Sequence, residues 1–491
     1  MSTTLESVAA AFRSVLPLQK RLEVFRVDQL DRVGLPVVQA MLVLPNEPAT
    51  IGYGYGATPI EGEVGALGEL CEEVHVGQAL ARLPRLVDSY ANLVRQRGQR
   101  GIADPLTLCL PAGSSYTPDL VLPWIEAQRW PTGETVLVPR EWVAAYPYQL
   151  GEPASVITPI TNGLGAGLDR EHAIAHGVME LLQRDGNVLT FRALDQGVTI
   201  DLDTELDPGT AALIDHLRGL GIEVMVKLAC TDMGFTNLYV VGNDPTPGVP
   251  VMVTACGEAS HPDRDRALRK ALLEFIGSRA RKASTHAPIP LLRTALPAAY
   301  VDAQIKVALI EEEESRALEA MAEWMAQDAG ELRRRLAPNV FSQHTSVPFS
   351  TLPHSDAVAD SAARLALIAG RLAAEGMEIL WVDCLDPASG VSVVKAIVPG
   401  LESETMSYHR IGWRGVKRLR ARGDALISDA PQPGHRRVRL RPEDEARCGG
   451  PAWFDTAAAD AMVGKLYALY RESGPFAAQL LLERQRRGNA A

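Results

Sequence analysis

Residues 66–72 read Ala-Leu-Gly-Glu-Leu-Cys-Glu, and a related pattern returns as Gly-Val-Met-Glu-Leu-Leu-Gln-Arg at 177–184 and as Ala-Leu-Leu-Glu-Phe-Ile-Gly at 271–277. In each segment a Glu lies among mostly apolar neighbours, with Gly or Ala three residues earlier. Residues three apart share a helix face, so the small residue leaves room beside the carboxylate. A carboxylate in an apolar stripe is costly unless a cation offsets its charge. The pattern predicts three helices whose acidic side chains share one ligand.

The spacing of the acidic residues favours Mg²⁺ together with a phosphate group. Glu69 and Glu72 are one helical turn apart, so both carboxylates can reach one ion. Oxygen ligands that leave positions for water and phosphate oxygens are typical of Mg²⁺ bound with a nucleotide. Arg184 follows Glu180 by one turn and is placed either to bind a phosphate oxygen or to pair with Glu180. The alternative is that each Glu simply faces solvent, as charged helix residues usually do.

Three longer segments that contain these helices resemble the nucleotide-binding helices of the YcaO superfamily. They are Gly54–Glu73, Asn162–Gly186 and Gly257–Arg279. Two further stretches, Phe25–Val38 and Val382–Gly400, resemble the framework of that family, so the likeness extends from about residue 22 to about residue 420. The resemblance implies an α/β (α+β) fold of mixed sheets flanked by helices, and an enzyme that uses ATP and Mg²⁺.

The resemblance also implies roles for individual side chains. By position it assigns Mg²⁺ to four carboxylates, those of Glu69, Glu72, Glu180 and Glu274. It assigns ATP to the same four residues together with Gln183, Arg184 and Arg279. No residue is assigned to the chemical step itself.

Members of this family phosphorylate the oxygen of a peptide backbone amide, so that a nucleophile displaces phosphate from the amide carbon. The products implied are azolines (thiazoline or oxazoline), thioamides or amidines in a ribosomally made precursor peptide. Azoline-forming members often end in a Pro-rich tail, whereas here the nearest Pro-x-Pro is Pro431–Pro433 and the chain continues to Asn489-Ala-Ala. Because no fused leader-binding or E1-like segment is evident, a separate partner for leader binding or sulfur delivery is expected.

Four positions depart from the usual pattern of the family. Tyr55 stands where a Lys is frequent, Gly65 where a Ser is frequent, Gln183 where a Glu commonly precedes the Arg, and Gly277 where a Gln is common. A Gln binds Mg²⁺ through its carbonyl oxygen, with less charge than a Glu. These departures keep a second hypothesis open: a degenerate, non-catalytic relative that acts as a scaffold or peptide-binding partner in a peptide-modifying complex.

The composition is that of a globular protein with a sizeable core. The chain has 491 residues, of which 46% are apolar and 22% charged, and its formal net charge is −11. This acidic balance and the short basic clusters speak against nucleic acid and anionic membranes as partners. The sequence shows no signal peptide and no apolar stretch long enough to span a membrane. Six separate cysteines without a CxxC pair indicate reduced thiols, so we expect a cytoplasmic protein.

We expect four parts along the chain. They are a lead-in over residues 1–21, a catalytic domain over 22–422, a polar, Pro- and Gly-rich linker over 423–452, and a helical tail over 453–491. The apolar face of the tail is expected to pack on the body of the protein or on a second copy in a homodimer.

Local patterns give further expectations. The runs Gly52–Gly56 and Asn162–Gly167 predict glycine-rich loops, Leu83–Gly101 predicts a helix, and Val249–Thr254 predicts a strand. The acidic stretch Glu311–Glu314 is expected to be a solvated face.

Other chemistries find less support. Asn162–Gly167 lacks the third Gly of a dinucleotide-binding fingerprint. His172, His176 and Glu180 share one helix face and suit zinc, but no HExxH pattern is present, so a zinc hydrolase remains a third hypothesis. Cys71 lies between two acidic residues, which favours a core role over a nucleophile.

Overall fold

Three strand–helix units build the centre of the fold, which a computed structural model describes for residues 4–17, 19–43, 49–151, 153–308, 314–355 and 360–488. In these units β3 (Thr50–Tyr55) leads into α2 (Pro59–Arg82), β7 (Leu164–Gly167) into α5 (Arg170–Asn187), and β11 (Cys256–His261) into α7 (Arg264–His286). Each helix begins after a side-chain cap, provided by Thr58, Asp169 and Asp263 respectively. The three acidic segments are therefore helical, as their spacing predicted.

Glycines in the strands let each helix pack directly on the preceding strand. A Cβ atom at Gly54 would lie 2.0 Å from the carbonyl oxygen of Gly62, and one at Gly257 would lie 2.0 Å from that of Ala271. In the middle unit a Cβ at Gly165 would lie 2.1 Å from the carbonyl oxygen of Ala173. The prediction of loops at Gly52–Gly56 and Asn162–Gly167 is therefore wrong, because β3 and β7 occupy most of these runs and need glycine for backbone contact.

Three main sheets carry the units. The first is antiparallel, with the order β1–β2–β3, where β1 is Arg21–Arg26 and β2 is Val37–Val43. The second has the order β11–β10–β9–β8–β12, and its other strands are β8 (Val198–Asp201), β9 (Glu223–Cys230), β10 (Thr236–Asn243) and β12 (Thr345–Pro348). Within this second sheet β12 pairs with β8 in parallel, and the remaining strand pairs are antiparallel.

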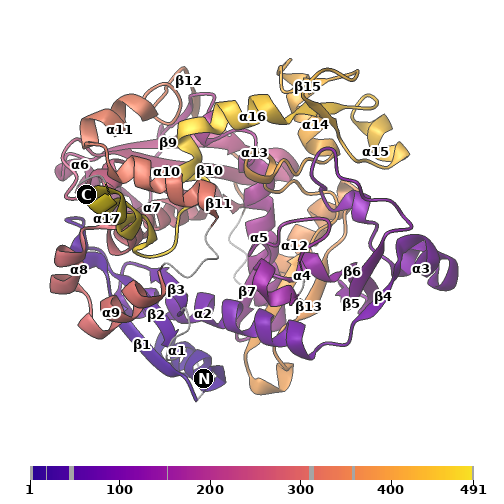
Figure 1. The fold of residues 1–491 in the computed structure, drawn as a ribbon, viewed down its shortest axis with the longest axis horizontal. Coiled ribbons are helices and arrows are strands. Elements are labelled where there is room, and N and C mark those ends of the chain that lie inside the picture. The colour runs from indigo at the N-terminus through magenta and orange to yellow at the C-terminus, as the bar shows by residue number, and fades with distance from the viewer. Residues whose placement is uncertain are drawn as a thin grey trace.

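The third sheet has the order β4–β5–β13–β14–β7, and β6 pairs with β5 at its side. Its strands other than β7 are β4 (Leu86–Ser89), β5 (Val121–Arg129), β6 (Glu134–Pro139), β13 (Leu380–Asp383) and β14 (Ser392–Ile397). In Figure 1, α5 runs through the middle of the molecule, with β9, β10 and β11 on its left and β4, β5 and β6 on its right. Helix α5 contacts both β14 and β11, so it joins the second and third sheets. The expected class, mixed sheets flanked by helices, is confirmed.

Shorter helices cover the sheets. They are α1 (Leu5–Val15), α3 (Tyr90–Arg97), α4 (Arg140–Val143), α6 (Pro208–Gly219), α8 (Ile289–Ala295), α9 (Ala298–Val307), α10 (Ser315–Met325), α11 (Ala329–Leu336), α12 (Ser361–Ala374), α13 (Thr405–Tyr408) and α14 (Trp413–Ala421). No helix in the described ranges has both the length and the apolar character that crossing a bilayer requires.

The segment expected to be a linker, 423–452, is folded. It contains β15 (Ile427–Ser428), β16 (His435–Arg437) and α15 (Pro442–Arg447), and its two strands pair with β17 (Trp453–Asp455) in a small sheet. Leu426 and Val438 are each only 1% exposed. The linker prediction is wrong. The composition of the segment is polar and Pro-rich, but a few buried apolar residues hold it in the fold. The chain then continues through α16 (Thr456–Val463) and α17 (Ala477–Gly488).

Two other local predictions are also wrong. Leu83–Gly101 is not one helix, since Leu83 ends α2 and the rest of the segment begins with β4 and continues into α3. Val249–Thr254 contains a 3-10 turn at Pro250–Val253, and the strand β11 follows it. Of the acidic stretch, residues 311–313 lie outside the described residues, whereas the Glu314 carboxylate accepts a hydrogen bond from the hydroxyl of Tyr467.

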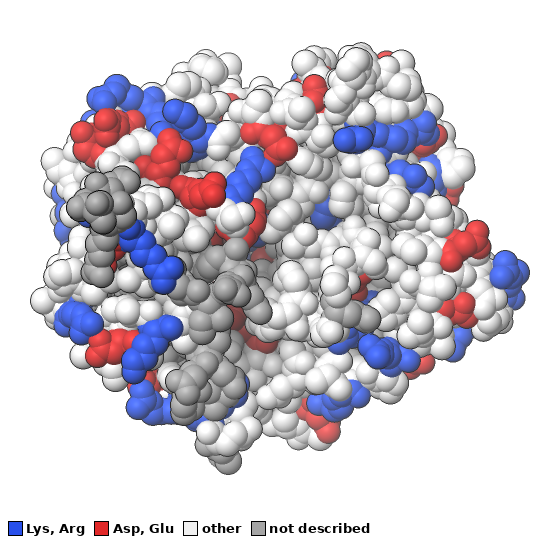
Figure 2. Space-filling model, in the orientation of Figure 1, with Lys and Arg blue, Asp and Glu red and all other residues white. Residues whose placement is uncertain are grey.

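The surface carries both charge signs. On the face shown in Figure 2, Lys and Arg side chains lie among Asp and Glu over much of the surface, and one group of blue side chains lies together at the upper right. This distribution agrees with the acidic composition of the chain.

Candidate functional site

Glu69 and Glu180 are held in the same way, each by the strand segment that precedes its helix. The backbone N–H of Tyr53 on β3 donates to Glu69 on α2, and the N–H of Gly163, just before β7, donates to Glu180 on α5 at 3.0 Å. Both carboxylates are half-buried. Main-chain atoms therefore fix the positions of these two acids.

Glu72 lies one turn beyond Glu69 on α2, and the negative charges of Glu69 and Glu180 both affect it. Burial raises the pKa of Glu72 well above its ordinary range, and the charges of Glu180 and Glu69 raise it further. Burial also raises the pKa of Glu69, to which Glu180 adds, although the Tyr53 N–H and Arg281 oppose the shift. The α2 and α5 acids thus lie near one another, and such like charges are costly without a cation among them.

Glu274 on α7 faces the same region from another side. The hydroxyl of Tyr55 donates to Glu274 at 3.2 Å. Burial raises the pKa of Glu274 to about 7, Glu258 contributes to the shift, and Arg184 opposes it. Tyr55 also feels the charge of Glu69, and Arg184 feels the charges of both Glu180 and Glu274. The acid of the third helix therefore lies within electrostatic reach of groups that the other two helices also affect. We call Glu69, Glu72, Glu180 and Glu274 the carboxylate cluster.

Glu258 on β11 is a member of the site that the sequence did not reveal. It is 4% exposed and accepts hydrogen bonds from Asn187 at 2.7 Å, Arg184 at 3.2 Å and Arg192 at 3.3 Å. Burial alone would raise the pKa of Glu258, but Arg184 and Arg192 together hold it below its ordinary value. It was missed because the strand was expected at Val249–Thr254, which left Glu258 without an assigned place.

Gln183 and Arg184 both contact Glu258. The amide nitrogen of Gln183, a residue only 3% exposed, lies 3.4 Å from Glu258. Arg184 lies 3.5 Å from Glu180 and 3.2 Å from Glu258, so it bridges an acid of α5 and an acid of β11. Arg184 therefore belongs to the site, whereas Gln183 is occupied in orienting Glu258.

Arg279, which the resemblance assigned to ATP, lies elsewhere. Its guanidinium is 1% exposed and forms ion pairs with Asp31 and Asp244, each at 2.9 Å, and it donates to the carbonyl of Met252 at 3.1 Å. Every nitrogen of the group has a partner in this buried network. The assignment of Arg279 to the nucleotide is wrong, because α7 turns this position away from the carboxylate cluster and into the protein interior.

Two of the departures from the family pattern explain each other. A Cβ atom at Gly277 would lie 2.6 Å from Cδ1 of Tyr55, so the Tyr55 ring occupies the space that a side chain at 277 would need. At Gly65 a Cβ would lie 3.1 Å from the Cα of Gly54, which is tight but not prohibitive. The Tyr55 ring thus fits on α7 only because residue 277 is glycine.

The region also offers hydrogen-bond donors without acceptors. Among the described residues, buried N–H groups of Arg184, Arg281 and Arg471 have no hydrogen-bond partner. Arg281 on α7 lies 3.6 Å from Glu472, whose charge is the main cause of the raised pKa of Arg281, and Glu69 adds to it. Buried arginine N–H groups without an acceptor, lying close to several acids, fit a polyphosphate with Mg²⁺.

The competing chemistries find no support in the geometry. Within the described ranges, the one group of three or more potential ligands close enough to share a metal is Asp263, Asp265 and His354. His172, His176 and Glu180 form no such group, and no three acids of the carboxylate cluster lie that close together in this structure. Most of Asn162–Gly167 is the strand β7, so this run does not form the glycine-rich strand-to-helix turn of a dinucleotide site. Cys71 is fully buried, and burial followed by the charge of Glu72 raises its pKa, as expected of a core thiol.

Comparison with known proteins relates this arrangement to one family. The model of that family, described as YcaO cyclodehydratase, ATP- and Mg²⁺-binding, matches residues 53–402. The chain is 26% identical over 408 residues to an uncharacterised protein of Methanothermobacter thermautotrophicus, covering 82% of this chain and 95% of that protein. It is 25% identical over 431 residues to an uncharacterised protein in the tfuA 3′ region of Rhizobium leguminosarum bv. trifolii, covering 84% and 92%.

Two solved structures have a similar fold. The YcaO protein from Methanopyrus kandleri, bound with AMPPCP and Mg²⁺, gives a TM-score of 0.57 at 20% identity and covers 84% of this chain and 94% of its own. A heterocyclase in complex with substrate and cofactor gives a TM-score of 0.58 at 18% identity, covering 82% of this chain. The match covers 52% of that heterocyclase, so this chain spans about half of its length. At these identities the likeness shows a common fold.

Proposed function

Because this chain belongs to the ATP- and Mg²⁺-binding YcaO family, whose model spans residues 53–402, we propose that it is an enzyme that activates a backbone amide of a peptide. Bound ATP with Mg²⁺ supplies the phosphoryl group that turns the amide oxygen into a leaving group, so that a sulfur, oxygen or nitrogen nucleophile can take its place on the amide carbon. The product is an azoline, a thioamide or an amidine in a ribosomally made precursor peptide. We further propose a separate partner protein that binds the leader peptide or delivers sulfur.

The carboxylate cluster is the single observation that carries this proposal. The acids of α2 and α5 act on one another, so burial together with their mutual repulsion raises the pKa of Glu69 and of Glu72. Glu274 on α7 and Glu180 both act on Arg184, which brings the third helix into the same electrostatic environment. A divalent cation offsets this repulsion, since it favours the charged form of each acid. We propose that Glu69, Glu72, Glu180 and Glu274 hold Mg²⁺.

The arginines beside the cluster have a complementary task. Arg184 and Arg281 each keep a buried N–H without a hydrogen-bond partner, and we propose that both donate to phosphate oxygens. Glu258 holds Arg184 in place through a 3.2 Å contact. Positioning and neutralisation of charge by such groups supply most of the rate in phosphoryl transfer.

Calorimetric titration with AMPPCP in the presence of Mg²⁺ tests this assignment. We expect the protein to bind the nucleotide, and we expect Glu69→Gln and Glu180→Gln to lose the Mg²⁺-dependent part of the affinity. Glu171→Gln is the matched control, because Glu171 is an exposed acid on the first turn of α5. Equal affinity in all four proteins would show that the assignment of these acids is wrong.

A scaffold without catalytic activity is the second candidate. It is favoured by Gln183, which is buried and hydrogen-bonded to Glu258 and so does not add a carboxylate to the cluster. Absence of any binding heat at saturating AMPPCP and Mg²⁺ would support the scaffold. Mass spectrometry of short peptides encoded beside the gene and co-expressed with the protein separates the products: loss of water marks an azoline or an amidine formed within the peptide, and exchange of oxygen for sulfur marks a thioamide. Fragmentation that locates the changed residue separates the azoline, at a Cys, Ser or Thr, from the amidine, at an amine.

A further inference from the structure

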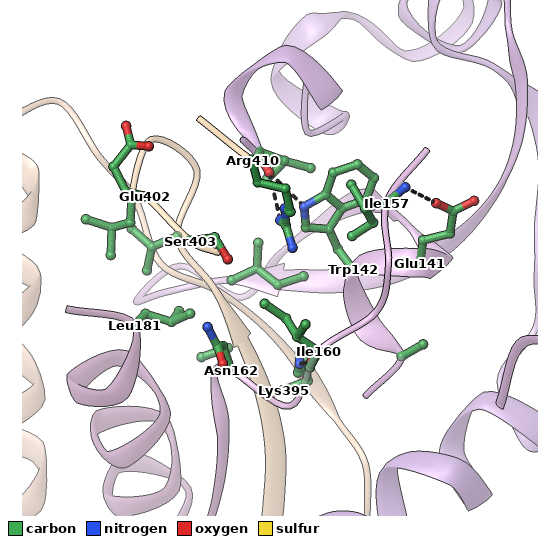
Figure 3. Close-up of a pocket in the computed structure, with 16 residues that line it drawn as sticks. Glu141, Trp142, Ile157, Ile160, Asn162, Leu181, Lys395, Glu402, Ser403 and Arg410 are labelled. Atoms are coloured by element: carbon green, nitrogen blue, oxygen red, sulfur yellow. Dashed lines mark hydrogen bonds between the residues drawn. The ribbon is translucent and has the colours of Figure 1, made fainter. Parts of the chain in front are cut away.

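A recess of about 60 Å³ has in its wall Leu181, which directly follows Glu180 of the carboxylate cluster (Figure 3). Its walls come from α4, from the chain segment before β7, from α5, and from β14 with the residues that follow it. Ten of the sixteen wall residues are apolar, among them Leu108, Trp142, Ile157, Ile160, Leu181 and Val398. A concave, mainly apolar wall of this kind suits an apolar group.

Three wall residues connect the recess to the cluster. Asn162 precedes Gly163, whose N–H holds Glu180, and Leu181 directly follows Glu180 on α5. Lys395 on β14 donates to the carbonyl of Ile160 at 2.8 Å. Burial lowers the pKa of Lys395 to about 8, against the opposing charge of Glu180. A group in the recess therefore lies next to the place where the cluster would hold its ligand.

The charged groups of the wall are already satisfied within the protein. Glu141 accepts backbone N–H groups at 2.9 and 3.0 Å, and Glu402 accepts two at 2.6 and 2.8 Å. Arg410 donates to two backbone carbonyls at 2.9 and 3.1 Å. Since these charges have their partners, the recess does not require a charged occupant.

Asn162 is different, because it has a donor to offer. It is 7% exposed, and its amide nitrogen has no hydrogen-bond partner among the described residues. Figure 3 shows this nitrogen directed into the recess. A buried amide donor without an acceptor is costly, and the carbonyl of a bound peptide would satisfy it.

We propose that this recess binds a bulky apolar side chain of the substrate peptide next to the amide that is modified, and that Asn162 donates to a peptide carbonyl there. This inference rests on the proposed function and names the class of substrate: peptides with a Leu- or Phe-like residue close to the reacting position. Leu181 and Ile160 set the size of the recess, so they are specificity-determining residues.

Binding of capped Gly-Xaa-Gly-Cys-Gly peptides, with Ala, Leu, Phe, Asp or Lys at Xaa, tests the proposal. Calorimetry is carried out both with and without AMPPCP and Mg²⁺. We expect the Leu and Phe peptides to bind about tenfold or more tightly than the Ala, Asp and Lys peptides, because burial of a large apolar side chain is favourable. We expect Leu181→Phe, which narrows the recess, to shift the preference from Phe to Leu. Ile160→Ala, which widens it, is expected to shift the preference toward Phe.

Matched measurements make the outcome decisive. Leu168→Phe is the control, because Leu168 is 36% exposed and does not line the recess. Asn162→Ala is expected to weaken all the peptides alike, and thermal melting verifies that each variant is folded. Equal binding of all peptides, or a ranking that the two size variants leave unchanged, would overturn the proposal. The ranking of peptide affinities without AMPPCP tests the recess alone. Binding of AMPPCP without peptide tests the proposed function, so either proposal can be disproved without the other.

Discussion

Tyr55 and Gly277 are in contact at the candidate site. Tyr55 fills the space beside Gly277 and also provides a hydrogen-bond partner for Glu274. The ring of Tyr55 lies where a side chain at 277 would begin, and its hydroxyl donates to Glu274 at 3.2 Å. The sequence alone marked both positions as unusual but gave no reason to connect them, because they are more than two hundred residues apart. The contact shows that the two unusual residues belong to one packing arrangement.

This pairing predicts a stability effect that depends on Tyr55. We expect Gly277→Ala to destabilise the protein by about 1–3 kcal/mol, because the new Cβ would lie 2.6 Å from the Tyr55 ring. In a Tyr55→Lys background the same change should be neutral or stabilising, as Ala favours a helix over Gly. Urea unfolding of the four proteins measures the coupling. Gly370→Ala on α12 is the control, since a Cβ there meets open space and should stabilise by about 0.5–1 kcal/mol.

Glu274 gives the stability of the metal-free protein a predictable pH dependence. Its pKa is about 7 when folded, against an ordinary value of 4.5, so the folded state holds this proton more tightly than the unfolded state does. Its contribution therefore falls as the pH rises from 4.5 to about 7. We expect Glu274→Gln to remove that fall, so that the variant gains stability relative to the parent across this window. Urea unfolding over a pH series measures the difference, and a difference that is constant with pH would contradict it.

At the scale of elements, the helices were easier to predict than the strands. The three acidic segments have helical spacing and side-chain caps, and these local features suffice to place α2, α5 and α7. The strands β3 and β7 read as loops because their glycines serve a contact with a helix that lies outside the local sequence. Glycine in a strand and glycine in a turn look alike until the packing partner is known.

The strand–helix contact itself predicts a severe effect at Gly257. A Cβ atom there would lie 2.0 Å from the carbonyl oxygen of Ala271 and 2.2 Å from the backbone nitrogen of Phe275, and neither atom belongs to a flexible side chain. We expect Gly257→Ala to reduce the yield of soluble protein or to destabilise it by about 3 kcal/mol or more. Gly101→Ala, where a Cβ meets nothing within 4 Å, should behave like the parent. Wild-type stability in Gly257→Ala would contradict the backbone contact.

At the scale of the whole molecule, the site is assembled from distant segments. The carboxylate cluster combines α2, α5 and α7, while Glu258 comes from β11 and Glu472 from the chain after α16. The sequence predicted the acids of the three helices and Arg184, because each stands out locally. It could not predict Glu258, Arg281 or Glu472, whose roles depend on pairing partners far along the chain.

Arg279 shows how the distant parts are joined, and it predicts the cost of breaking that junction. Its partner Asp31 lies between β1 and β2, and its partner Asp244 lies just after β10, so the ion pairs tie two regions to α7. Arg279→Met would leave the buried carboxylate of Asp31 without a cation, whereas Asp244 would keep its ion pair with Arg32 at 2.6 Å. We expect a loss of about 3–5 kcal/mol in unfolding experiments. Arg218→Ala, which removes an exposed ion pair with Asp215, should change stability by less than about 1 kcal/mol. Equal effects of the two substitutions would contradict the structural role.

The contact between strand glycines and helix backbone has a consequence for how such a protein can change over generations. Main-chain atoms set the distance between each strand and the helix that carries the acid. Substitutions of the surrounding side chains therefore need not displace the acids. Substitutions as large as tyrosine for lysine can then accumulate around a stationary set of oxygens. The lining of the recess beside the acids can then change while the acids keep their positions.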